Sequence, residues 1–148
     1  MSDNLPAGYY PQWSQLQLEP AKYMSTLNLS GDLIPAEGEP EGYGTILQNN
    51  DTNSALMIDG VTPSVSDRVL IKNQIEEIQN GTYIVLTVGD DVTPWQLTRA
   101  PDMNFGFQLV AGMYVIITGG ATQNGKFAIL QSPVPVEING DDIVFLSY

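Results

Sequence analysis

The sequence predicts an all-β fold, either an antiparallel sandwich or a partly open barrel of about eight strands joined by tight Asn-Gly hairpins. Three observations lead to this prediction. Short runs of β-branched and aromatic residues recur about every ten residues. Turn-forming residues separate these runs, among them 14 glycines and 10 prolines. No stretch has the apolar spacing of an amphipathic helix.

The chain of 148 residues is long enough for one domain with its own core. We expect residues 1–20 to form an extended N-terminal arm and residues 21–148 to form a β-rich domain. The arm has neither helical nor strand periodicity, yet it carries Tyr9, Tyr10 and Trp13. Rings left in water gain nothing, so these residues should dock, either on their own domain or on a neighbouring subunit.

The first strand of the domain is expected over residues 22–30, where Leu27 and Leu29 share the buried face. Residues 32–53 are interrupted by prolines and glycines and predict a long insertion loop, with a short strand possible at 43–47. A further short strand is expected at 55–58.

The central part of the chain has the clearest signals. An apolar run at 69–71 is too short for a helix, and Asn80-Gly81 offers a tight turn because both residues tolerate positive φ. Runs rich in strand formers follow at 82–88 and 94–99. Together these segments predict a β-meander against which the rest of the domain packs.

The C-terminal part predicts three more strands. Residues 113–117 are apolar on both faces, which is typical of a central strand. Asn124-Gly125 and Asn139-Gly140 are hairpin signals, and they precede apolar runs at 127–130 and 143–146.

Composition argues against several functions. The chain has 17 acidic and 5 basic residues, a net charge of −12, which disfavours binding to nucleic acid or to anionic lipid. It has neither cysteine nor histidine, so disulfides, thiolate metal sites and the commonest general base are excluded. No apolar run approaches the length of a membrane helix, and we expect no secretory signal at the N-terminus. The acidity itself is explained either by solubility or by a cation or basic partner.

Paired carboxylates do not predict an enzyme. A glycosidase needs two carboxyl groups that face each other across a substrate. The acidic doublets of this chain are adjacent in sequence, and neighbours on a strand point to opposite faces. These doublets are Glu76-Glu77, Asp90-Asp91 and Asp141-Asp142.

Two kinds of ligand remain as alternatives. Calcium prefers clusters of oxygen ligands, and the best candidates are Glu37, Glu39, Glu41 and Asp51, although no EF-hand loop is present. A host surface glycan would stack on exposed aromatic rings. The candidates for such stacking are Trp13, Tyr43, Trp95 and Tyr148, of which Trp95 is expected in the core.

Several segments, taken in order, resemble a β-rich module of tailed-bacteriophage structural proteins. That family follows the pattern IDGV, GDRVLVKNQ, NGIY and WxLxRAxD. The corresponding segments here are DGV at 59–61, DRVLIKNQ at 67–74, NGTY at 80–83 and WQLTRAPD at 95–102. The chain departs from the pattern at Ser66, where the family has glycine, and in the long segment at 32–53.

This resemblance implies a virion component assembled in the host cytoplasm, tail-fibre-like or capsid-decorating, without catalytic chemistry. Its partners would be other virion proteins and further copies of itself, with a trimer expected from virion symmetry. We expect four charged residues of the motif to be structural ion pairs that hold strand ends, because a buried guanidinium needs partners. These residues are Asp67, Arg68, Arg99 and Asp102.

Overall fold

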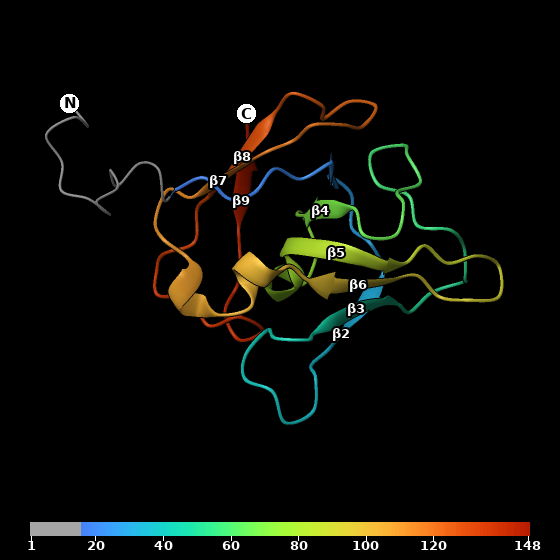
Figure 1. Cartoon of the computed structure of the whole chain (residues 1–148), viewed down its shortest axis with the longest axis horizontal. Helices are drawn as coiled ribbons and strands as arrows, with labels where there is room; N and C mark the ends of the chain where they lie inside the picture. Colours follow the sequence, from blue (N-terminus) through green and yellow to red (C-terminus); the bar gives the residue numbers. More distant parts are fainter. Residues whose placement is uncertain (1–15) are drawn as a thin grey trace, which may run out of the picture.

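The computed structural model of the chain describes residues 16–148, and within them it is all-β, as predicted (Figure 1). Six strands form one mixed sheet in the order β1-β4-β5-β6-β3-β2, here called the large sheet. Three form an antiparallel sheet in the order β7-β8-β9, the small sheet. The strands of the large sheet are β1 (Tyr23–Met24), β2 (Gly31–Ile34), β3 (Ile46–Asn49), β4 (Arg68–Ile71), β5 (Gly81–Thr87) and β6 (Gln96–Arg99). Those of the small sheet are β7 (Tyr114–Ile116), β8 (Phe127–Leu130) and β9 (Phe145–Ser147).

The predicted meander is present as β4, β5 and β6, which pair in antiparallel fashion. Neighbouring residues of a strand face opposite sides of a sheet, and β4 shows this directly. Val69 and Ile71 belong to one hydrophobic cluster, whereas Leu70 belongs to another. The large sheet therefore has a core on each of its faces.

The first cluster lies between the two sheets, and the second lies on the opposite face of the large sheet. Leu70 of the large sheet and Val115 of the small sheet share the first cluster. Leu56 and Ile58 cover the second cluster, although the strand expected at 55–58 is absent and Ile58 makes only a single bridge, to Val61. Trp95 and Leu97 are both buried in this second cluster, on one face of their strand, as predicted.

Residues 32–53 are more regular than predicted. β2 and β3 lie within or overlap this segment, pair as an antiparallel hairpin and extend the large sheet through β6. The connection at 35–45 and residues 50–53 are irregular. The glycines and prolines that indicated a loop all lie in the 35–45 connection. The strands on either side of it are joined to the large sheet by backbone pairing of β3 to β6, which is distant in sequence and leaves no local signal.

The first strand also differs from its prediction. Only Tyr23 and Met24 pair as a strand, and they run parallel to β4 rather than antiparallel. Leu27 is 78% exposed instead of buried. Beyond Met24 the segment is held by hydrogen bonds from Gln74, whose side chain binds both the N–H and the C=O of Leu29.

The Asn-Gly signals were only partly correct. Asn80-Gly81 is not a tight hairpin turn, because residues 72–80 connect β4 and β5 and end in the short 3-10 helix η3 (Glu77–Gln79). The Asn80 side chain is buried, accepting from the Gln74 N–H and donating to the Ile143 C=O. Asn124-Gly125 does lie in the turn of the β7–β8 hairpin, whereas Asn139-Gly140 lies within the longer 131–144 connection.

The arm boundary predicted at residue 20 is too late. Leu18 is buried in the first cluster, and Gln17 and Ala21 form parallel bridges to Tyr114 and Ile117. β7 is an edge strand of the small sheet. The two bridges cover the edge of β7 that does not pair with β8. Within residues 16–148 no helix is long and apolar enough to cross a membrane.

Candidate functional site

The charged motif residues predicted as structural ion pairs make polar contacts with other segments of the domain. Arg68, on β4, makes two parallel hydrogen bonds to Asp102, Nη1 to Oδ1 at 2.9 Å and Nη2 to Oδ2 at 2.6 Å. Its Nε donates to the Glu19 C=O at 3.0 Å. Asp102, which lies in the short helix η4 (Pro101–Met103), also accepts from the Thr82 hydroxyl. The pair thus ties β4, β5, η4 and the N-terminal strand segment together.

Arg99 is buried and holds backbone carbonyl groups instead of a carboxylate. Its Nη1 donates to the Asn80 C=O at 2.6 Å, and its Nη2 donates to the Ile78 C=O at 2.7 Å and to Asn139 Oδ1 at 3.2 Å. Its guanidinium lies over the Tyr83 ring, 4.9 Å from the ring centroid. Burial lowers the pKa of Arg99 and raises the pKa of Tyr83. These contacts close the 72–80 connection onto β6.

Asp67 is not a partner of either arginine. It accepts the Ser64 N–H at 2.8 Å within the turn before β4, and Lys22 Nζ lies 3.7 Å from its Oδ1. Lys22 is half exposed, so this pair is weak. The four motif residues therefore form three separate contacts and do not converge on a common site.

The candidate calcium ligands are not brought together. Glu37, Glu39 and Glu41 lie in the 35–45 connection, whereas Asp51 lies beyond the other end of β3. Glu41 is already used, since its Oε2 accepts from the N–H groups of Gly106 and Ile138. Among residues 16–148 no group of three or more acidic side chains is placed to hold a metal ion.

The predicted partner-binding residues Tyr9, Tyr10 and Trp13 lie outside the described residues. The described chain begins at Leu16, whose C=O accepts from the Tyr114 N–H at 2.9 Å. The segment that carries the three rings is thus joined to the domain directly beside β7.

The outer face of the small sheet is apolar and carries no charged side chain along its paired residues. Its inner face contributes Val115, Ala128 and Phe145 to the core, so the alternate positions point away from the core. Phe127 is 40% and Tyr148 57% exposed, and their backbones pair directly. We call this surface the outer face; its residues are Tyr114, Ile116, Phe127, Ile129, Leu146 and Tyr148.

Three rings gather on the outer face. Phe127 and Tyr148 stack with ring centroids 5.7 Å apart, and Tyr114 meets the edge of Phe127 at 6.4 Å. Tyr148 was a candidate for glycan stacking, but sequence reasoning did not connect it with the other two. The strands that carry the rings are short, so their pairing partners could not be read from periodicity.

A second group of exposed rings lies at the 35–45 connection. Tyr43 stacks on Phe105 with ring centroids 6.3 Å apart, and Phe105 stacks on Phe107 at 5.5 Å. Phe107 is 82% exposed. Tyr43 was predicted as a glycan contact, whereas Phe105 and Phe107 were missed. We call these residues the aromatic row.

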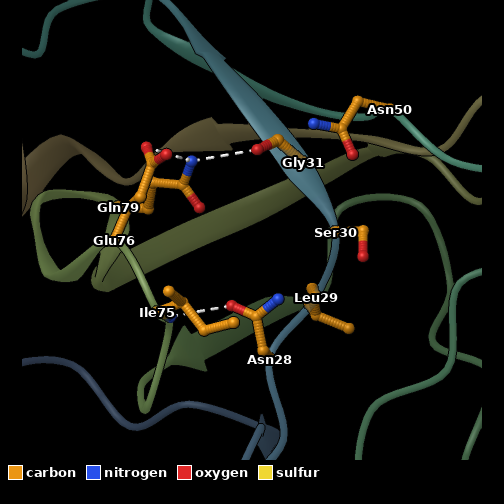
Figure 2. Close-up of a pocket in the computed structure, with 8 residues that line it drawn as sticks. All are labelled: Asn28, Leu29, Ser30, Gly31, Asn50, Ile75, Glu76 and Gln79. Atoms are coloured by element: carbon orange, nitrogen blue, oxygen red, sulfur yellow. Dashed lines mark hydrogen bonds between the residues drawn. The ribbon is translucent and has the colours of Figure 1, made fainter.

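A polar hollow of about 210 Å³ lies between the segment after β1 and the 72–80 connection (Figure 2). Figure 2 shows that its polar side chains bind the chain itself: Asn28 Oδ1 accepts from the Ile75 N–H at 2.8 Å, and Gln79 Nε2 donates to the Gly31 C=O at 2.9 Å. The hollow is therefore mainly the place where polar contacts hold residues 28–31 against the domain.

One further carboxylate of the motif, in the DGV segment at 59–61, has a structural role. Asp59 accepts from the Thr122 hydroxyl and from the N–H groups of Thr122 and Gln123. Desolvation opposes its ionisation, but these hydrogen bonds and the charge of Lys126 outweigh it and lower the pKa of Asp59. The contact joins the 59–60 turn to the β7–β8 hairpin.

Comparisons of the chain with protein-family models, with curated proteins and with solved structures found no match.

Proposed function

We propose that the chain is a non-enzymatic structural subunit of a tailed-bacteriophage particle, tail-fibre-like or capsid-decorating, which acts by assembly with other virion proteins. The outer face of the small sheet is the observation that carries this proposal. Contiguous apolar surface of this kind is uncommon on monomeric proteins and marks sites of protein contact. The sequence resemblance supports the same role.

The contacts of the motif residues are consistent with a scaffold. Arg68, Arg99 and Asp102 hold backbone segments and each other. The contacts of the residues that the chain shares with the phage module are thus consistent with a role in supporting the β-core.

Reconstitution onto particles tests this role. Phage particles that lack the protein are mixed with increasing amounts of purified chain, and bound protein is measured after sedimentation. We expect saturable binding at a fixed number of copies per particle. A Phe127→Ser, Tyr148→Ser variant should fail to bind, whereas Phe107→Ser, a matched loss of an exposed ring elsewhere, should bind normally. Absence of binding by the wild-type chain would reject the proposal.

A glycan-binding adhesin module is the second candidate, favoured by the aromatic row. Exposed rings in a row offer flat apolar surface to the faces of sugar rings. The exposed Glu37 and Glu39 lie in the same connection as Tyr43 and could accept hydrogen bonds from sugar hydroxyls.

Binding to host polysaccharide separates the two candidates. An adhesin binds purified polysaccharide in isolation and loses that binding in Tyr43→Ala and Phe107→Ala, while Phe127→Ala retains it. The assembly subunit shows the reverse dependence, on Phe127 and for particles. A glycan array with no signal for the wild-type chain would reject the adhesin.

A further inference from the structure

The outer face of the small sheet and the N-terminal segment match in position and in chemistry. We propose that Tyr9, Tyr10 and Trp13 of one copy dock on the outer face of a second copy. This inference names the partner of the face described above, and it rests on the proposed role of that face in assembly.

The direction of the chain at its first described residues favours a second copy as the partner. Gln17 pairs with Tyr114 and Ala21 with Ile117, both in parallel orientation. The described chain therefore begins at the end of the sheet at which β7 begins. To cover the outer face of its own domain the segment must reverse direction, whereas a copy placed beyond that end can be reached without a reversal.

The segment can reach only a nearby surface. Three peptide units separate Trp13 from Leu16, and a fully extended chain covers about 3.3–3.6 Å per residue, so Trp13 lies within roughly 10 Å of the anchored residue. Tyr9 lies within about 25 Å by the same measure. The receiving face must then belong to a copy in direct contact with the donor, which fits a subunit packed in an assembly.

Charge also matches between the two surfaces. The chain has a net charge of −12, yet residues 4–15 contain no charged side chain, and neither do the paired residues of the outer face. Docking of these two surfaces removes no ionised group from water, which would be costly. Most other parts of this acidic chain would bring carboxylates to the contact.

The sequence of the segment suits aromatic surfaces. Pro11 stands between Tyr10 and Trp13, and proline favours an extended, polyproline-like backbone that loses little entropy on binding. The rings of Tyr114, Phe127 and Tyr148 offer the kind of aromatic surface on which such segments dock. Tyrosine and tryptophan are also the residue types that contribute most to the centres of protein contacts.

Two full-length variants test the contact from each side. The segment variant carries Tyr9→Ser, Tyr10→Ser and Trp13→Ser, and the face variant carries Phe127→Ser and Tyr148→Ser. Sedimentation velocity over a concentration series measures the association of each. We expect the wild-type chain to associate and each variant to associate at least tenfold more weakly. Phe107→Ser is the control and should behave as the wild type.

Mixing the two variants gives the sharper result. The face variant still supplies an intact segment, and the segment variant still supplies an intact face, so an equimolar mixture should form a one-to-one complex. Leu146→Lys, which places a charge on an exposed position of the face, serves as a second face variant if the first does not fold.

Each other outcome overturns the proposal. A wild-type chain that stays monomeric at all concentrations would indicate that the segment covers its own face or that another protein does. Association that survives in the segment variant but not in the face variant would indicate face-to-face pairing of two small sheets. A mixture that forms no complex would exclude exchange of the segment between copies.

The same variants separate this inference from the proposed function. Self-association through the segment without any binding to particles would reject the role in the virion and keep the contact between copies. Particle binding that depends on Phe127 and Tyr148 but not on Tyr9, Tyr10 and Trp13 would keep the role in the virion and reject the contact proposed here.

Discussion

The two sheets of the molecule use their apolar residues differently. The large sheet has a hydrophobic cluster on each face, and β1 and β4 contribute residues to both. The small sheet buries one face and leaves rings exposed on the other. Stability is therefore expected to depend on the large sheet and on the inner face of the small sheet, whereas the outer face is available for contact with another protein.

The largest expected effect comes from two phenylalanines on opposite faces of the small sheet. Phe145 is 3% exposed, so Phe145→Ala should destabilise the fold by about 3–5 kcal/mol through loss of burial and the cavity left behind. Phe127→Ala on the outer face should cost about 1 kcal/mol or less. Urea unfolding of both variants measures the difference. Equal losses would show that the outer face is part of the core.

The next effect concerns the buried arginine of the large sheet. Arg99→Met removes the donors for the C=O groups of Ile78 and Asn80 and should destabilise the chain by about 3 kcal/mol, because buried acceptors without partners are costly. Lys126→Met, at an exposed cation, is the control and should change little. A loss below about 1 kcal/mol would mean that water replaces the guanidinium.

A smaller effect is expected for the Arg68–Asp102 pair. Asp102→Asn keeps the shape of the side chain but removes the charge that Arg68 binds, which should cost about 1–2 kcal/mol because the pair is only partly buried. A double-mutant cycle with Arg68→Met isolates the contribution of the pair. Additive losses would show that the two residues act independently.

The smallest effect is a pH dependence at the contact between the 59–60 turn and the β7–β8 hairpin. The pKa of Asp59 is lowered in the folded chain, so its contribution is fully present above the unfolded value of about 3.9 and is lost as the pH falls through the folded pKa. Asp59→Asn should therefore lower the thermal midpoint at pH 7, and this difference should shrink as the pH falls below the unfolded value and through the folded pKa. Glu39→Gln, at an exposed carboxylate, is the control. A difference that persists at acid pH would show that charge is not its cause.

The sequence predicted the parts of the fold in which local pattern and tertiary packing agree. The meander of β4, β5 and β6 follows from apolar runs and alternation, and the burial of Trp95 follows from its alternation with Leu97. The hairpin turn predicted at Asn80-Gly81 was wrong because the Asn80 side chain binds Gln74, in the same connection, and the distant Ile143, which hold it inside the domain.

The candidate site was less predictable, since it depends on register between distant strands. Phe127 and Tyr148 pair across two strands, and Tyr43 stacks on Phe105 from another part of the chain. No local pattern joins residues so far apart. The sequence did indicate that aromatic rings outside the core would bind a partner. It did not indicate which of these rings gather on one surface.

The bridges between Gln17, Ala21 and the β7 region have a consequence for synthesis on the ribosome. They join the first described residues to a sheet whose last paired residue is Tyr148. The small sheet cannot be completed until the chain as far as Tyr148 has left the ribosome, while the β4–β6 meander can pair much earlier. Contacts between residues so distant in sequence also slow folding. The nascent chain is thus expected to pass through a state in which the large sheet is formed while the strands of the small sheet are still unpaired, and this is the state that chaperones would meet.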